Sequence, residues 1–154
     1  MTDKLEISAS AVSGAVEGDL DKAVLQRLIE DAGGVVGRIH GLHGKPHLLS
    51  RLNGYNAAAA HNPWVVIVDL NGDAACAPQA RTRWLPPGPS QRMCFRIAVK
   101  EVEAWLMGDQ ERLARFLSVA RNRVPAQPET VAEPKALMVI IAARSRRGDI
   151  RTDM

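Results

Sequence analysis

Cysteine and aromatic residues are scarce in this chain of 154 residues. It has two cysteines, three tryptophans, two phenylalanines and one tyrosine. Cys76 and Cys94 are too few for a disulfide framework and too far apart for a CxxC motif. We therefore interpret both as reduced packing residues in a cytoplasmic protein.

Long hydrophobic runs are also missing. No apolar segment approaches the roughly 18 residues that span a membrane, and Met1–Glu6 lacks the basic and then apolar pattern of a signal peptide. With 46% hydrophobic and 24% charged residues, the composition is that of an ordinary globular protein. We predict one domain over residues 1–154. The polar segment 144–154 shows no closing element, so we expect either a frayed tail or a chain truncated at its C-terminus.

The formal net charge of +3 hides an asymmetry between the two halves of the chain. Residues 1–80 carry six Lys or Arg and nine Asp or Glu, whereas residues 81–154 carry 14 and eight, and 12 of those 14 are arginine. Guanidinium groups match phosphate oxygens in pairs. An acidic half beside an arginine-rich half therefore suits a phosphodiester substrate, and the alternative is that these arginines form ordinary solvated surface.

The clearest local signal is a run of β-branched residues that ends in a carboxylate. Residues 65–68 (VVIV) are followed by Asp69, and Asp73 comes four positions later. Such a short apolar run, bounded by turn residues, is typical of a strand buried on both faces of a parallel sheet. Because the carboxyl ends of strands in an open α/β sheet face the ligand crevice, we expect Asp69 to meet a ligand.

An earlier segment repeats this arrangement. Residues 11–16 predict a short strand that ends at Glu17, and a helix follows with Asp19 as its N-cap. If the two strands are neighbours in a parallel sheet, Glu17 and Asp69 converge at one edge. Carboxylate oxygens at that density favour Mg²⁺ or Mn²⁺, since such ions bind through one or two carboxylates, waters and substrate phosphates.

Strands and helices alternate along the rest of the chain, without an internal repeat. Further strands are predicted at residues 35–40 and 93–99. Helices are predicted at residues 47–60, 80–84, 110–121 and 134–146. In the helix from residue 110, we expect Leu113, Phe116 and Leu117 to face inward. The alternation predicts an α/β fold with a parallel sheet flanked by helices.

Three familiar motifs fail on spacing. An EF-hand loop that starts at Asp69 needs glycine sixth and glutamate twelfth, whereas Gly72 is fourth and Ala80 is twelfth. A phosphatase with an aspartyl nucleophile needs aspartate at the position of Asn71. Pro46 stands where a P-loop has the serine or threonine that holds Mg²⁺, which excludes that motif.

Two further groups of polar residues have more than one interpretation. His40, His43 and His47 are spaced like zinc ligands, but no cysteine or further ligand lies at a suitable distance along the chain. We interpret them as loop histidines near a phosphate path or as simple surface residues. Glu101 and Glu103 begin a helix at the end of a strand, where they serve either the helix dipole or a metal or active site.

Three segments together resemble the Toprim domain. Residues 16–25 (VEGDLDKAVL) look like its opening, in which a glutamate ends strand one and a helix follows. Residues 68–71 (VDLN) look like its second motif, an Asp-x-Asp after a later strand. Residues 97–109 (IAVKEVEAWLMGD) are similar to a family of small, uncharacterised bacterial Toprim-like proteins, a domain of unknown function whose members carry a Glu-Ala-Trp-Leu segment and usually run on past this point. The resemblance covers most of the chain.

The resemblance implies a Toprim-like, Rossmann-like fold with a mainly parallel sheet. In the related nucleases of overcoming-lysogenization-defect type, Mg²⁺ serves phosphoryl transfer on nucleic acid. The resemblance assigns metal-ligand and catalytic roles to Glu17 and Asp69. Asn71 replaces the second aspartate as a weaker ligand, and Asp73 would substitute for it. Apart from the resemblance, Glu101 or Glu103 would help to hold the ion, since they follow the end of another strand.

Two functions follow from the resemblance and the charge pattern. The first is a metal-dependent phosphodiester-transfer enzyme, a nuclease acting on nucleic acid in the cytoplasm. The alternative is a non-catalytic or conditionally active Toprim-like partner of an ATPase in a bacterial defence or repair system. Asn71 and the small size of the chain favour the alternative.

Overall fold

The computed structural model describes residues 10–152. The segment Met1–Glu6 and the last two residues of the polar C-terminal segment lie outside this range. The described chain divides into two compact units, which we treat separately. Unit 1 comprises residues 10–68 and 81–96, and unit 2 comprises residues 69–80 and 97–152.

A four-stranded, all-parallel sheet has the strand order β2-β1-β3-β4. The strands are β1 (Val12–Val16), β2 (Val36–Gly41), β3 (Trp64–Asp69) and β4 (Met93–Ala98). Ala15 of β1 pairs with His40 of β2 on one side and with Val66 of β3 on the other. Ala15 and Val66 are completely buried, as expected for strands covered on both faces. The predicted α/β fold with a parallel sheet is confirmed.

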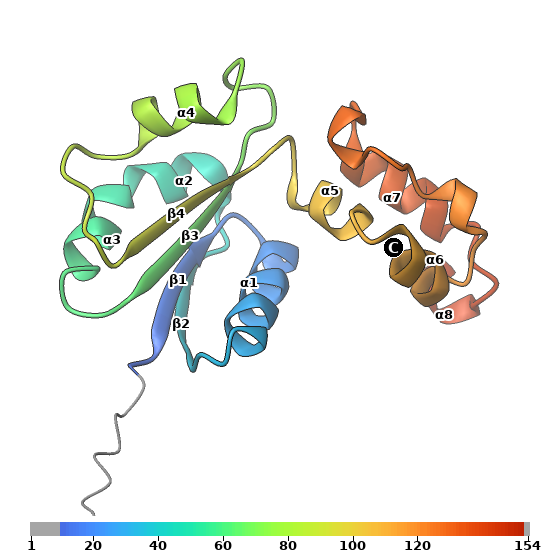
Figure 1. Cartoon of the computed structure of the whole chain (residues 1–154), viewed down its shortest axis with the longest axis horizontal. Helices are drawn as coiled ribbons and strands as arrows, with labels where there is room; N and C mark the ends of the chain where they lie inside the picture. Colours follow the sequence, from blue (N-terminus) through green and yellow to red (C-terminus); the bar gives the residue numbers. More distant parts are fainter. Residues whose placement is uncertain (1–9, 153–154) are drawn as a thin grey trace, which may run out of the picture. The chain divides into compact units, whose positions relative to one another are not determined.

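Helices connect the strands of unit 1 across both faces of the sheet. They are α1 (Asp19–Asp31) between β1 and β2, and α2 (Gly44–Ser50) and α3 (Leu52–Ala58) between β2 and β3. The two connections run in opposite directions along the sheet. Because parallel crossovers are right-handed, they cover opposite faces, as Figure 1 shows. Where the sequence predicts a single helix over residues 47–60, the structure has two short helices, α2 and α3, which cover one face of the sheet.

The start of α1 differs from the prediction. The N-cap is Gly18 rather than Asp19, and the Gly18 N–H donates to the Asp21 carboxylate over 2.9 Å. Glycine can cap a helix, and a carboxylate in the first turn then satisfies its backbone N–H. The helix buries Leu25 and Ile29, whereas Leu28 is 49% exposed.

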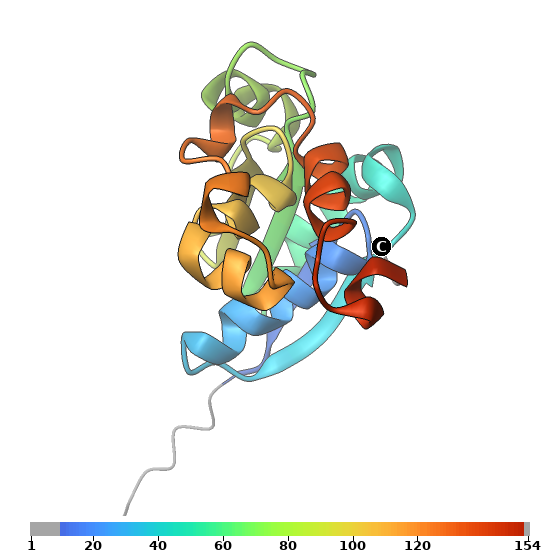
Figure 2. The same ribbon diagram turned by 90° about the vertical axis from the view of Figure 1, so that its right-hand side faces the viewer.

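Unit 2 is mainly helical. Its helices are α5 (Val102–Met107), α6 (Gln110–Leu117), α7 (Pro134–Ala142) and α8 (Gly148–Thr152), with 3-10 turns η1 (Arg121–Arg123) and η2 (Pro128–Thr130); α4 (Ala77–Trp84) precedes β4. Figure 2 shows the helices from α5 to α8, coloured yellow to red, gathered around one another. Their core consists of Met107, Ala114, Leu117, Val124, Met138, Ile141, Ala142 and Ile150.

Two expectations about unit 2 are wrong. Phe116 of α6 does not face inward, because 62% of it is exposed, while the neighbouring Leu117 is buried. The polar C-terminal segment contains α8, although no closing element is predicted there. Ile150, an apolar side chain in α8, packs into the core, and the Arg151 guanidinium donates to the Ser145 carbonyl over 2.6 Å. A single apolar anchor is too weak a signal to predict a helix from sequence.

Among residues 10–152, no helix combines the length and the apolar character that crossing a bilayer requires.

Candidate functional site

The predicted site residues belong to different units, and each group is described within its own unit. Glu17 belongs to unit 1, where it follows the last residue of β1. Its backbone carbonyl accepts a hydrogen bond from the Gly44 N–H over 3.1 Å, at the start of α2. Glu17 therefore stands at the carboxyl edge of the sheet, where the sequence predicts it.

Asp69 belongs to unit 2 and is the last residue of β3. Its Oδ1 accepts a hydrogen bond from the backbone N–H of Val102 over 3.0 Å. Val102 is the first residue of α5, so its N–H has no partner within the helix. The strand-end carboxylate thus caps a helix that begins 33 residues further along the chain.

Asn71 joins the loop after β3 to the loop after β4. Its backbone N–H donates to the Lys100 carbonyl over 3.0 Å. With the amide oriented to satisfy both neighbours, its side-chain nitrogen donates to the Lys100 carbonyl (3.1 Å) and to Glu101 Oε1 (3.2 Å). An ionised aspartate only accepts hydrogen bonds. Asparagine, and not the aspartate of the Toprim motif, therefore matches the acceptors around position 71.

The remaining predicted residues lie in three different environments. Glu101 accepts the Lys135 N–H at the start of α7 over 2.9 Å. Glu103 is only 8% exposed and lies on the buried face of α5. Asp73 is exposed in the turn after β3, where its N–H donates to the Leu70 carbonyl. The structure links Asp69, Asn71 and Glu101 through neighbouring loops, and Glu103 is buried on α5.

The predicted metal ligands are divided between the two units, because Glu17 lies in unit 1 and the others lie in unit 2. Within residues 10–152, no three side chains of aspartate, glutamate, histidine or cysteine come together in an arrangement that could hold an ion. In unit 2, Asp69 and Glu101 instead each accept a backbone N–H at the start of a helix.

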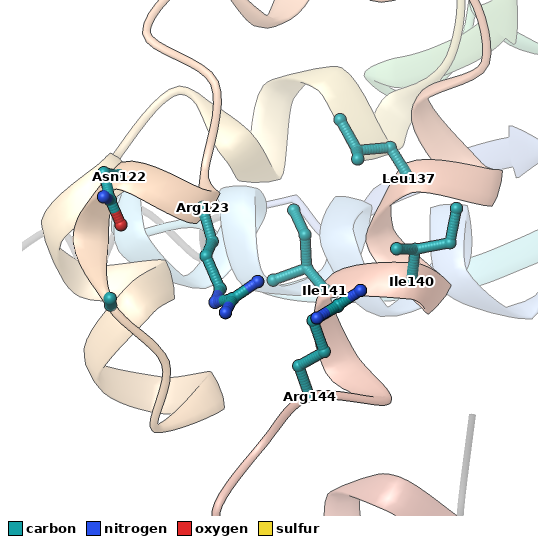
Figure 3. Close-up of a pocket in the computed structure, with 7 residues that line it drawn as sticks. Asn122, Arg123, Leu137, Ile140, Ile141 and Arg144 are labelled. Carbon is teal, nitrogen blue, oxygen red and sulfur yellow. The ribbon is translucent and has the colours of Figure 1, made fainter.

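Unit 2 carries a basic pocket that the sequence analysis identifies only as an arginine-rich region. This surface hollow of about 640 Å³ is lined by Ala120, Asn122, Arg123, Leu137, Ile140, Ile141 and Arg144. Figure 3 shows the guanidinium groups of Arg123 and Arg144 on either side of Ile141. Neither guanidinium has a hydrogen bond or an ion pair with another side chain in the described part of the chain. The two arginines are 21 residues apart, and only packing of η1 near the end of α7 brings them together.

Unit 1 carries a second, more polar pocket of about 360 Å³ at the end of β2. It is lined by Arg38, Ile39, His40, Gly41, His43, His47, Arg51 and Tyr55. The sequence analysis identifies the three histidines but misses the arginines and the tyrosine. A spacing signal was available, because positions 43, 47, 51 and 55 lie four residues apart along α2, α3 and their caps.

Burial shifts the pKa values of two side chains in this pocket. Desolvation, together with the nearby positive charge of Arg38, lowers the pKa of His40 below 6.5. Burial raises the pKa of Tyr55 above 10.0, although the nearby Arg51 opposes this shift. Both shifts favour the neutral side chain near pH 7. The positive charge of the pocket at that pH therefore comes first from Arg38 and Arg51.

No protein-family model, curated protein or solved structure matches this chain. The parallel sheet flanked by helices is consistent with a Toprim-like fold and with Rossmann-like folds in general. The likeness to Toprim proteins therefore rests on residues 16–25, 68–71 and 97–109 and on this architecture.

Proposed function

We propose that this chain is a Toprim-like protein that binds nucleic acid, as a non-catalytic or conditionally active partner in a larger assembly such as one driven by an ATPase. The observation that carries the proposal is the basic pocket of unit 2, in which Arg123 and Arg144 flank an apolar wall. All residues that line this pocket belong to unit 2.

The two guanidinium groups favour an anionic ligand. No acidic side chain lines the pocket, and within residues 10–152 neither guanidinium is paired with one. Two like charges on one hollow repel each other, and an anion between them relieves that repulsion. Arginine also offers a planar fork of donors that matches phosphate oxygens. A phosphate of a phosphodiester backbone meets these requirements.

The apolar wall favours a single strand over a duplex. Leu137, Ile140 and Ile141 line the same hollow as the two arginines, and Ile140 is 56% exposed. In a single strand the sugars and unpaired bases can lie on apolar or guanidinium surfaces next to the phosphates. In a duplex the bases are stacked inside, and such a wall has no partner.

Replacing Arg123 and Arg144 together by glutamine is expected to weaken binding of a fluorescent single-stranded oligonucleotide by about 10- to 100-fold, because two charge-assisted contacts are lost. The slope of log affinity against log salt is expected to fall by about 1.4, since each neutralised phosphate of a single strand contributes about 0.7. Fluorescence anisotropy at several salt concentrations measures both quantities.

The matched control removes two arginines of unit 2 that already have acidic partners. Arg112 pairs with Asp109 over 3.4 Å, and Arg115 pairs with Glu111 over 3.0 Å, both on α6. Arg112→Gln with Arg115→Gln changes the arginine count equally but leaves the pocket intact. Equal losses of affinity in the two double variants would show that the net charge alone holds the strand, and the assignment of the pocket would then be wrong.

The polar residues after β3 support a structural role in the isolated chain. Asp69 and Glu101 accept backbone N–H groups from α5 and α7, and Asn71 is placed to donate to Glu101. Each of these bonds uses acceptor capacity that a cation would otherwise need. This network favours the non-catalytic or conditionally active form of the proposal.

A metal-dependent nuclease is the second candidate, and one feature of the sheet favours it. The connection after β1 runs in the opposite direction to the connection after β3, and these strands are neighbours. Open α/β sheets bind ligands outside the carboxyl ends of strands at such a switch point. Glu17 follows β1, and Asp69 ends β3.

Incubation of the isolated chain with single- and double-stranded DNA and RNA in Mg²⁺ or Mn²⁺ separates the two candidates. We expect the substrates to stay intact, and we expect Asn71→Asp to lower the free energy of unfolding by about 1 kcal/mol, because aspartate cannot donate to Glu101. Cleavage that disappears in both Glu17→Gln and Asp69→Asn would establish the nuclease instead. Asp69→Asn keeps an oxygen that can accept the Val102 bond, so its loss of activity would not reflect a lost helix cap.

A further inference from the structure

We propose that unit 1 carries a separate binding site for a phosphate monoester, in the pocket at the end of β2. The inference goes beyond the proposed function, because the nucleic-acid pocket of unit 2 shares no residue with this site. Its polar lining consists of Arg38, His40, His43, His47, Arg51 and Tyr55.

The charge of this pocket favours an anion. No carboxylate lines it, and within residues 10–152 the guanidinium groups of Arg38 and Arg51 have no hydrogen bond or ion pair with another side chain. The neighbouring histidines can only add positive charge when they take up protons. The same histidines do not form a metal site, because no group of three potential ligands within the described residues could hold an ion. The chemistry of the lining therefore matches a ligand that accepts hydrogen bonds.

The number of donors favours a phosphate over a carboxylate. Two arginines, three histidines and one tyrosine line one hollow, and each guanidinium alone has five N–H donors. A carboxylate has two oxygens, whereas a terminal phosphate presents three strong acceptors and up to two negative charges. The donor set is thus matched by a phosphate monoester.

Ring contacts hold one side of the site in place. The His40 ring stacks on Trp64 with centroids 5.3 Å apart and lies 6.0 Å from the Tyr55 ring. Tyr55 in turn stacks on Trp64 at 5.2 Å, and Trp64 is 6% exposed. Because buried stacking fixes these side chains before a ligand arrives, little conformational entropy is lost on binding.

The volume of the pocket is compatible with a ligand of the size of a nucleotide. Small-molecule sites span roughly 300–1,000 Å³, and this pocket has about 360 Å³. A phosphate with one attached sugar and base fits that volume. The same chemistry is present in a free nucleoside monophosphate and at the phosphorylated 5′ end of a nucleic acid, so the test distinguishes these two sources.

The test uses the full chain and isothermal titration calorimetry with adenosine 5′-monophosphate, adenosine and inorganic phosphate. We expect binding of the two phosphates but not of adenosine. Arg38→Gln with Arg51→Gln is expected to weaken binding of both phosphates at least tenfold, since two charge-assisted contacts are lost. Arg112→Gln with Arg115→Gln is the control, because these two paired arginines line neither pocket, and it is expected to leave these affinities unchanged.

Two further measurements identify the source of the phosphate and test whether the variant is folded. The first measurement compares an oligonucleotide with a 5′-phosphate and the same oligonucleotide with a 5′-hydroxyl. If the 5′-phosphate form binds at least tenfold more tightly, and only to chains that keep Arg38 and Arg51, the ligand is a nucleic-acid end. If both forms bind equally, the ligand is a free nucleotide. Thermal unfolding of the Arg38/Arg51 variant shows whether it is folded. The proposal is wrong if the folded wild-type chain binds neither phosphate at millimolar concentration, or if the folded variant binds them as the wild type does. If the variant unfolds, His43→Gln with His47→Gln replaces it under the same criterion.

Discussion

Replacing Phe95 by alanine is expected to lower the free energy of unfolding by about 3–5 kcal/mol, the range for removal of a buried aromatic ring. Phe95 lies on β4 and is 1% exposed, so the deleted atoms leave a cavity in unit 1. The ring also receives the Arg81 guanidinium at 5.9 Å from its centroid, and Arg81 donates to the Phe95 carbonyl over 2.8 Å. The guanidinium loses its ring partner as well, which adds to the cost. Urea unfolding followed by circular dichroism measures the change.

The other phenylalanine of the chain provides the matched control. Phe116 is 62% exposed on α6, and its main partner is the Arg147 guanidinium at 5.8 Å from the ring centroid. We expect Phe116→Ala to cost about 0.5 kcal/mol, the size of an exposed cation–π contact. Similar losses for the two variants would contradict the burial that the structure assigns to β4.

The second large effect is expected for Gly41→Ala at the end of β2. Gly41 has φ of +101°, and a Cβ atom at this position would lie 2.0 Å from the Val16 carbonyl oxygen. Val16 and Gly41 are paired in the sheet, and the same carbonyl accepts the Leu42 N–H over 3.2 Å. The obstacle is therefore backbone, which cannot rotate away as a side chain does. We expect a loss of about 3 kcal/mol or more in the free energy of unfolding from strain and overlap combined.

Gly54→Ala is the control for this prediction. Gly54 lies inside α3, has no atom within 4 Å of its built Cβ, and is exposed. Because glycine is a poor helix former, alanine here is expected to raise the free energy of unfolding by about 0.5–1 kcal/mol. Opposite signs for the two glycine variants are the expected result. A Gly41→Ala chain as stable as the wild type would mean that β1 and β2 do not pair in this register.

Local sequence patterns were sufficient to predict the sheet. The apolar run at residues 65–68 and the small-residue run at 11–16 correspond to β3 and β1, and the alternation of elements correctly predicts parallel pairing. A buried parallel strand needs apolar side chains on both faces, so its signal is dense and local. The outward direction of Phe116 was not predictable in this way, because two adjacent positions on a helix compete for one apolar face and packing decides between them.

For the candidate sites, too, the sequence predicts where residues lie along the chain, and the tertiary structure determines what they contact. Sequence alone placed Glu17 and Asp69 at strand ends, and the structure agrees. Only the tertiary structure decided what surrounds them: Val102 donates to Asp69, and Asn71 meets Glu101 thirty positions later.

Both basic pockets were likewise decided by tertiary structure. The sequence shows that one half of the chain is rich in arginine, but it does not show which arginines line the same pocket. Arg123 and Arg144 come from different elements, and so do Arg38 and Arg51. Strand and helix signals depend on neighbours a few residues apart, whereas a binding site depends on distances that only the packed chain sets.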